Sequence, residues 1–257
     1  MSEEKVLVED IATSRIVTIN RASQRNCIDK EVADLLVDAF EDFESDDSLK
    51  VAILTGAGGN FCAGADLKAI SQGKGNKVTI DGYGPLGISR LRLGKPTIAA
   101  VEGYAVAGGL ELALWCDLRV ASESAVFGVF CRRFGVPLID LGTIRLPRLI
   151  GQSRAMDMIL TGRGVDAAEA YDFGLANRVC QTGQALQTAI NLATELSEFP
   201  QLCMRSDRLS SLEQWGMTET EAMTNEVNRG LKVIMSGETV AGASSFVKGQ
   251  GKHGNFS

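Results

Sequence analysis

One acidic residue lies alone in a segment that is otherwise apolar on all sides. Glu111 is the only charged residue of GGLELALW, residues 108–115, a predicted short helix with leucines, an alanine and a tryptophan around it. Burying a lone carboxylate costs several kcal/mol unless the group is paired, hydrogen-bonded or neutral. A protein that keeps such a group can use its raised pKa in general acid–base catalysis. Two structural roles are also open: a favourable place in the first helical turn, or a pairing with an arginine.

Two short runs of small residues could present backbone N–H groups to a ligand. The first is NFCAGADLKAI, residues 60–70, which follows a short apolar run predicted to be a buried strand. The second is Ala107–Gly109, directly before the helix that carries Glu111. Small side chains let a ligand approach the backbone, and the free N–H groups can donate to an oxygen. The alternative for the first segment is an ordinary tight turn between a strand and a helix, and the alternative for Ala63 and Gly108 is simple close packing.

The composition narrows the chemistry further. The only histidine, His253, lies close to the C-terminus, which argues against a Ser-His-Asp triad, a Cys-His pair and a polyhistidine metal site. The cysteines are scattered without a C-x-x-C pair, which is typical of free thiols in a reducing compartment. They are Cys27, Cys62, Cys116, Cys131, Cys180 and Cys203. A carboxylate is therefore the expected proton carrier near neutral pH, ahead of a tyrosine, a lysine or a cysteine.

The length and charge of the chain favour a globular protein. Its 257 residues can bury a sizeable core, and hydrophobic residues at 45% with charged residues at 23% are typical of globular domains. A net charge of −6 argues against nucleic-acid binding over the whole surface. No apolar run reaches the roughly 18 residues of a membrane span, and the acidic start MSEEKVLVED differs from a targeting peptide. We expect a cytoplasmic protein without membrane or nucleic-acid partners, unless a targeting segment was removed.

Strands and helices alternate along residues 1–199. Alternating or continuous apolar runs predict strands at 5–10, 16–20, 51–55, 96–101, 117–121, 125–127 and 175–179. Asp29 is the predicted N-cap of a helix with one buried, apolar face, which we expect to consist of Val32, Leu35, Leu36, Ala39, Phe40 and Phe43. This order predicts an α/β fold with largely parallel strands.

Two other segments have a different character. Residues 71–84 are rich in glycine and show little periodicity, which predicts a mobile loop of the kind that admits substrates. From Pro200 to Val247 the pattern is helical. A helical unit at residues 200–257 is too small to be stable alone, so we expect it to pack on the main domain or on another subunit.

Several of these segments resemble the enoyl-CoA hydratase/isomerase (crotonase) family. The motifs that carry the resemblance are the G-A-D turn, residues 64–66, and KPTIAAVEGYAVAGGLELALWCD, residues 95–117. The similarity reaches back to NRASQRNCID, residues 20–29, and continues through residues 127–151 and 160–179 into the helical tail. It covers essentially the whole chain, in matching order and spacing.

The resemblance implies a fold, an assembly and a substrate class. The family fold is a spiral of repeated ββα units followed by a C-terminal helical oligomerisation region, here residues 1–199 and 200–257. The implied assembly is a homotrimer, or a hexamer formed as a dimer of trimers. The implied substrate is an acyl-CoA thioester. Coenzyme A is then part of the substrate, and we expect no metal or redox cofactor.

The resemblance also assigns roles to particular residues. Glu111 would be the catalytic glutamate, and the backbone N–H groups of Ala63 and Gly108 would hold the thioester carbonyl and stabilise its enolate-like oxyanion. Asp66 would order the G-A-D turn and would not move protons. The other residues implied to lie near the thioester or the CoA moiety are Gly64, Ala65, Arg25, Cys27, Phe246 and Lys248.

One position departs from the family pattern. Family members that hydrate enoyl-CoA carry a second glutamate shortly after the F-G strand end, where this chain has Cys131. A thiol, with an ordinary pKa of about 8.5, substitutes poorly for a carboxylate that holds water. Asp140, farther along, resembles the catalytic aspartate of the family's dienoyl-CoA isomerases. Its structural alternatives are a cap on the helix near Leu141, or a pairing with an arginine. The candidate arginines are Arg132, Arg133 and Arg145.

Two classes of function follow. In the first, Glu111 and Asp140 share proton transfer around an unsaturated thioester, and the alternative outcomes are hydration, double-bond isomerisation or a related lyase reaction. In the second, a non-catalytic crotonase-fold protein binds acyl-CoA or a protein partner without turnover. The missing second glutamate favours this second class, whereas the retained Glu111 counts against it.

Overall fold

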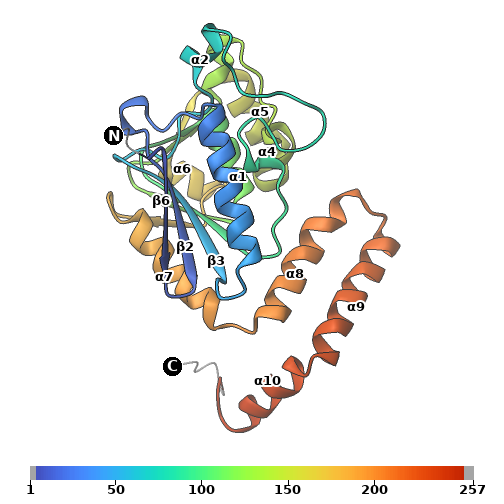
Figure 1. Ribbon diagram of the computed structural model, residues 1–257. Helices are drawn as coiled ribbons and strands as arrows, with labels where there is room; N and C mark the ends of the chain where they lie inside the picture. Colours follow the sequence, from blue (N-terminus) through green and yellow to red (C-terminus); the bar gives the residue numbers. More distant parts are fainter. Residues whose placement is uncertain (1–3, 252–257) are drawn as a thin grey trace. The chain divides into compact units, whose positions relative to one another are not determined.

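The computed structural model describes residues 4–251 (Figure 1). The chain divides after residue 196 into two compact units, a large N-terminal unit and a smaller C-terminal one that starts at residue 197. The larger unit contains all the strands of the described chain, and the C-terminal unit is helical.

A six-stranded sheet forms the centre of the larger unit. Its strand order is β1-β2-β3-β4-β6-β9, and only the β1–β2 pair is antiparallel. The strands are β1 (Val6–Ile11), β2 (Ser14–Ile19), β3 (Val51–Gly56), β4 (Thr97–Val101), β6 (Leu118–Ser122) and β9 (Arg178–Cys180). A second sheet has the order β5-β7-β8, with β5 (Tyr104–Val106), β7 (Val126–Gly128) and β8 (Gly164–Asp166). The predicted α/β class with largely parallel pairing is confirmed.

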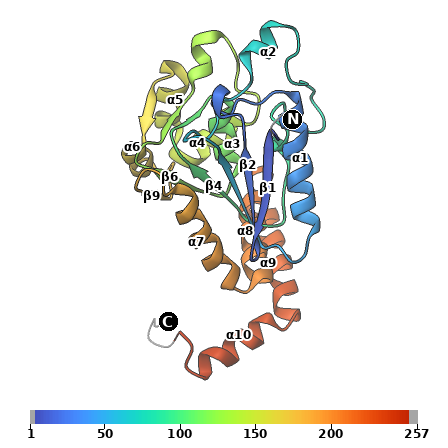
Figure 2. The ribbon, with the colours of Figure 1, turned by 60° about the vertical axis from the view of Figure 1, so that its left-hand side comes forward.

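Helices cover both faces of the large sheet (Figure 2). Because neighbouring residues of a strand point to opposite faces, Leu54 of β3 packs in the same cluster as Phe40, and the adjacent Ile53 packs with Ala189. Phe40 belongs to α1 (Lys30–Ser45) and Ala189 to α7 (Ala185–Glu198). The remaining helices of this unit are α2 (Leu67–Ser71), α3 (Gly108–Trp115), α4 (Gly142–Ile150), α5 (Gln152–Thr161) and α6 (Ala167–Asp172).

The predicted N-cap of α1 is confirmed. The Asp29 side chain accepts a hydrogen bond from the Val32 N–H at 2.9 Å, which satisfies one of the free donors of the first turn. Of the apolar residues predicted to share the buried face, Val32, Leu36, Ala39, Phe40 and Phe43 lie in the main core, as their spacing predicts. Leu35 does not, since it is exposed at the edge of that face.

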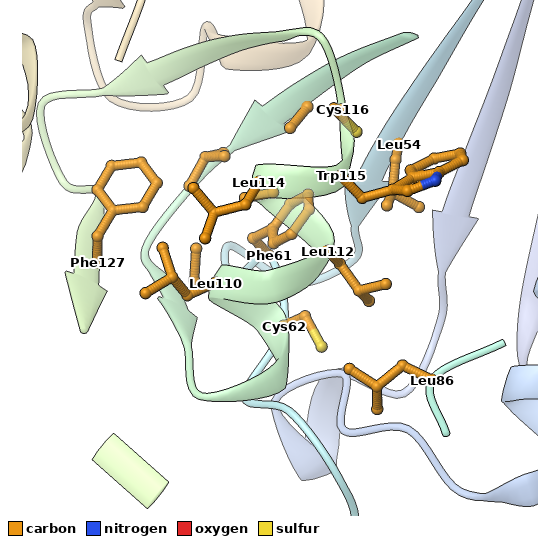
Figure 3. Close-up of a cluster of buried hydrophobic side chains, with 14 of the residues drawn as sticks. Leu54, Phe61, Cys62, Leu86, Leu110, Leu112, Leu114, Trp115, Cys116 and Phe127 are labelled. Atoms are coloured by element: carbon orange, nitrogen blue, oxygen red, sulfur yellow. The ribbon is translucent and has the colours of Figure 1, made fainter. Parts of the chain in front are cut away.

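Helix α3 is buried along its whole length, as its composition predicts. Figure 3 shows its leucines and Trp115 packed among side chains from β3, β7 and the segment that follows β3. The Trp115 ring also meets Phe40 edge-on, with ring centroids 4.9 Å apart. This packing fixes the helix that carries Glu111.

Three strand predictions need correction. β5 and β8 were not expected, and each is only three residues long. The strand predicted at 175–179 begins only at Arg178. The N–H groups of Leu175 and Ala176 instead donate to the Ala170 carbonyl and close the end of α6.

The C-terminal unit contains α8 (Gln201–Glu213), α9 (Glu219–Met235) and α10 (Glu238–Val247), in agreement with the helical pattern after Pro200. Arg229 of α9 forms an ion pair with Glu213 of α8, and Thr218 begins α9 with a capping box. Several apolar side chains of α9 remain exposed. They are Met223, Val227, Leu231, Ile234 and Met235. Within residues 4–251, no helix has the length and apolar character needed to cross a membrane.

Candidate active site

The Glu111 carboxyl is held by two backbone N–H groups. The side chain lies in the first turn of α3, and the residue is only 2% exposed. Its Oε1 atom accepts hydrogen bonds from the N–H of Asp140 at 2.9 Å and of Gly142 at 2.8 Å. Within residues 4–251, Oε2 accepts no hydrogen bond and no arginine forms an ion pair with Glu111. The arginine alternative is therefore wrong, and the position in the first helical turn is confirmed.

The surroundings of Glu111 favour its protonated form. Burial is the main cause, and the negative charge of Asp140 acts in the same direction; together they raise the pKa of Glu111 to about 7. The two backbone hydrogen bonds and the positive charge of Arg145 oppose this rise. Glu111 can therefore give or accept a proton near neutral pH, which is the property that a general acid–base catalyst needs.

An unusual backbone conformation aims both donors at Glu111. Leu141, which lies between Asp140 and Gly142, has a φ of 71°, in the left-handed region that side chains other than glycine rarely adopt. Gly142 has to be small, because a Cβ there would lie 2.7 Å from Glu111 Cγ. The strained turn thus places the N–H groups on either side of Leu141 around one carboxylate oxygen.

Asp140 is also buried, and its carboxyl does not have either of the structural roles left open by the sequence. The residue is 3% exposed. The N-cap of α4 is Leu141, with no side-chain cap. Asp140 forms no salt bridge with another residue in the described range, and Arg145 Nη1 donates to the Asp140 carbonyl at 3.3 Å and not to its carboxyl.

Ser89 and Leu86 hold the Asp140 carboxyl. Asp140 Oδ1 accepts a hydrogen bond from the Leu86 N–H at 3.0 Å and a shorter one from the Ser89 hydroxyl. Burial raises the pKa of Asp140, while these two hydrogen bonds oppose the rise. The sequence did not indicate these partners, because Ser89 lies in the 3₁₀ turn Ile88–Arg90, 51 residues before Asp140. No local pattern connects positions so far apart.

The two carboxyls are anchored in the same way. In each, two donors hold one oxygen, and the other oxygen makes no hydrogen bond within residues 4–251. The main-chain N–H of Asp140 contacts Glu111 directly. The structure therefore brings the two predicted acid–base residues together, each with a fixed orientation and one uncommitted oxygen.

The predicted backbone donors need one correction. The N–H of Ala63 donates to the Arg25 carbonyl at 3.0 Å and is not available to a ligand in this structure. The Gly64 N–H donates to Cys62 Sγ at 3.3 Å. Ile28 forms the two backbone hydrogen bonds that flank Ala65. Its N–H donates to the Gly64 carbonyl, and its carbonyl accepts from the Asp66 N–H.

Two N–H groups remain beside each other, those of Ala65 and Gly108. Neither donates to another group within residues 4–251. Their segments touch, since a Cβ on Gly64 would lie 2.7 Å from the Gly108 nitrogen. Ala107 precedes Gly108 with a φ of 55° and a ψ of −124°, a strained conformation held by the hydrogen bond from its N–H to the Gly128 carbonyl. The free N–H of Gly108 therefore directly follows a backbone conformation that this hydrogen bond holds in place.

The remaining residues predicted near the ligand fall into two groups. Asp66 caps α2 and pairs with Arg21 at 3.0 Å, so it orders the G-A-D turn as expected. Arg25 and the half-buried Cys27 lie beside this turn, in contact through the hydrogen bonds that join residues 25–28 to residues 63–66. Phe246 lies in α10, and Lys248 is the first residue after this helix. Both belong to the C-terminal unit and are exposed. Their position near CoA stays a prediction.

Cys131 is a buried neighbour of Glu111. The residue is 6% exposed and lies in the 3₁₀ turn Phe130–Phe134. Burial and the charge of Glu111 raise the pKa of the Cys131 thiol. The thiol is therefore protonated near neutral pH and is a poor base. The two neighbouring arginines bind carbonyl groups, Arg132 that of Ile159 and Arg133 that of Gly162.

Comparisons with known proteins agree with the resemblance seen in the sequence. The family model described as enoyl-CoA hydratase/isomerase matches residues 11–250. Enoyl-CoA hydratase EchA19 of Mycobacterium tuberculosis is 40% identical over 247 residues, which cover 94% of this chain and 93% of that protein. Mevalonyl-coenzyme A hydratase sidH of Aspergillus fumigatus is 35% identical, with 91% and 88% of the two chains covered.

A solved structure shares the fold. The crystal structure of enoyl-CoA hydratase EchA1 from Mycobacterium marinum matches with a TM-score of 0.90 and 37% identity, over 96% of each chain. The predicted crotonase-type α/β fold is thereby confirmed. The chain belongs to the enoyl-CoA hydratase/isomerase family.

Proposed function

We propose that this protein is an acyl-CoA enzyme in which Glu111 and Asp140 exchange protons with an unsaturated thioester. The observation that carries the proposal is the pair of buried carboxyls, each anchored through one oxygen. A pKa of about 7 at Glu111 suits proton transfer at neutral pH. A chain that only bound acyl-CoA would have no need for two such groups, which is why we favour the enzyme over a non-catalytic binding protein.

The proposed oxyanion donors are the N–H groups of Ala65 and Gly108. They would bind the thioester oxygen, which becomes negative when a proton leaves or joins the neighbouring carbon Cα. Each donor of this kind typically contributes about 3–4 kcal/mol to transition-state stabilisation. Proton transfer of this type involves no electron carrier, so we expect coenzyme A as part of the substrate and no metal or redox cofactor.

The second proton-handling group is proposed to be Asp140 and not Cys131. Hydration needs one proton placed on Cα and another taken from the attacking water, and isomerisation needs one proton removed and one returned. Asp140 has an uncommitted carboxyl oxygen and contacts Glu111 through its main-chain N–H, whereas the Cys131 thiol is neutral near pH 7. Because EchA19, EchA1 and sidH are named as hydratases, we place hydration first and isomerisation second.

We also propose assembly into a homotrimer or a dimer of trimers through the C-terminal unit. The exposed apolar residues of α9 recur on one face, since Val227 lies four residues after Met223 and four before Leu231. A second copy could cover this stripe.

In the C-terminal unit, Lys248 is proposed to attract CoA phosphates, so a Lys248→Glu variant should bind free CoA more weakly. Unchanged CoA affinity would remove that assignment.

A panel of unsaturated acyl-CoA thioesters, analysed by mass spectrometry after incubation with the protein, tests the proposed reaction. Gain of one water identifies a hydratase, and an unchanged mass with a moved double bond identifies an isomerase. No change with any thioester, together with measurable acyl-CoA binding, would support the non-catalytic alternative.

A further inference from the structure

We propose that Ser89 is a positioning residue that fixes which oxygen of Asp140 faces the substrate. The inference rests on the proposed function, because it concerns the same pair of carboxyls. Ser89 is fully buried, and its hydroxyl donates to Asp140 Oδ1. The Leu86 N–H donates to the same oxygen, so the other oxygen, Oδ2, is the one left for chemistry.

Arg145 locks Ser89 and Asp140 together a second time. Its Nη2 atom donates to the Ser89 carbonyl at 2.8 Å, and its Nη1 atom donates to the Asp140 carbonyl at 3.3 Å. The two residues are thus joined both through their side chains and through one guanidinium. This double link holds the 3₁₀ turn Ile88–Arg90 against the segment that begins α4.

Gly84 keeps the space around this hydrogen bond empty. A Cβ at position 84 would lie 1.9 Å from Ser89 Oγ and 2.6 Å from Asp140 Oδ1. Gly84 does not adopt a left-handed φ, so its backbone would accept an alanine. The reason for glycine here is therefore space, and an added methyl group would push apart the two groups that Ser89 and Asp140 bring together.

The contact has a kinetic consequence that simple packing would not have. A hydroxyl that donates to a carboxylate stabilises its charged form and prevents rotation of the group. Without it, the Asp140 carboxyl would sample orientations in which neither oxygen meets the substrate, and its proton would be held more tightly. We expect kcat to fall while KM changes little, because the positioning matters in the transition state.

The test uses Ser89→Ala in the full-length protein, with Ser122→Ala as the matched control. Ser122 is equally buried, but its hydroxyl bonds to Ser124. We expect Ser89→Ala to lose at least about tenfold in kcat. One limb of the wild-type kcat–pH profile should be absent in Asp140→Asn, which assigns that limb to Asp140. In Ser89→Ala the same limb should move to higher pH by about 0.5–1 unit. Ser122→Ala should keep the wild-type kcat and profile.

Gly84→Ala gives a second route to the same result, since it disturbs the contact and removes neither group. Gly216→Ala is its control, because a Cβ there meets nothing within 4 Å. Thermal unfolding of each variant shows whether it is folded. A wild-type kcat and an unmoved limb in Ser89→Ala, or an equal loss in Ser122→Ala, would overturn the inference.

The failure of this inference is distinguishable from failure of the proposed function. If Asp140→Asn is impaired and Ser89→Ala is not, only the role of Ser89 is wrong. If Asp140→Asn keeps the wild-type kcat, Asp140 has no proton to handle, and both the proposed function of the carboxyl pair and the role of Ser89 are overturned.

Discussion

Replacing Glu111 by glutamine should inactivate the protein and at the same time stabilise its fold. The glutamine Oε1 can still accept the N–H groups of Asp140 and Gly142, which now bind Glu111 Oε1 at 2.9 and 2.8 Å. The amide cannot exchange a proton near neutral pH, so kcat should fall by about 10²–10⁴-fold while acyl-CoA binding is retained. The amide also carries no charge to bury.

The size of the stabilisation follows from the pKa of Glu111. Burial and Asp140 raise this pKa from 4.5 to about 7, and each pH unit corresponds to 1.36 kcal/mol. Between these two values the folded protein holds a proton that the unfolded chain has lost, so the wild-type fold loses stability as the pH rises. Above pH 7 the loss is complete, at about 3 kcal/mol. Glu111→Gln avoids this loss of stability. Below the pKa that Glu111 has in the unfolded chain, wild type and variant should be equally stable.

Urea unfolding at about pH 8 and about pH 4.5, at one protein concentration, measures this difference. We expect Glu111→Gln to be more stable than wild type by up to about 3 kcal/mol at the higher pH and to lie within about 0.5 kcal/mol of it at the lower pH. Glu195→Gln, an exposed change on α7, is the control and should stay within about 0.5 kcal/mol at both. A variant that is less stable than wild type at pH 8, or a gain that does not shrink on acidification, would refute the reasoning.

Three further predictions concern the site and the assembly. Asp140→Asn should lower kcat by at least about 10²-fold, whereas Cys131→Ala should change it little; steady-state kinetics that rank them in reverse would assign the second role to the thiol. Gly64→Ala should lose activity, because its Cβ would lie 2.7 Å from the Gly108 nitrogen and block the proposed oxyanion donors; wild-type kinetics would place these donors elsewhere. Val227→Asp should convert the proposed trimer to monomers in light scattering, since it charges an exposed position of the α9 stripe, and an unchanged mass would move the interface away from α9.

The sequence predicted Glu111 because its signal is local. A single charge within eight apolar residues conflicts with burial, and the conflict is visible without knowledge of any partner. The N-cap Asp29 and the apolar face of α1 are equally local, and both were predicted correctly apart from Leu35, which is exposed. Asp140 was found only through the family resemblance, since nothing next to it in the sequence distinguishes catalysis from a helix cap.

The errors arose at contacts between distant segments. Gly64, which lies between Ala63 and Ala65, has a φ of 90°, so the backbone turns there and no regular alternation in the sequence tells which N–H stays free. The choice depends on Arg25, whose carbonyl takes the Ala63 N–H and which lies in a separate segment. The same applies to Ser89, which reaches Asp140 only when the 3₁₀ turn Ile88–Arg90 packs against the start of α4.

The central claim is that Glu111 and Asp140 together carry out proton transfer on an unsaturated acyl-CoA. The most direct measurement compares wild type with the Glu111→Gln/Asp140→Asn double variant in the acyl-CoA mass-spectrometry assay, with acyl-CoA binding measured in parallel. We predict a hydrated or isomerised product from wild type, and no product from a double variant that still binds the thioester. Conversion by the double variant at more than about a tenth of the wild-type rate would contradict the claim, since loss of a general acid–base group costs at least about 10²-fold.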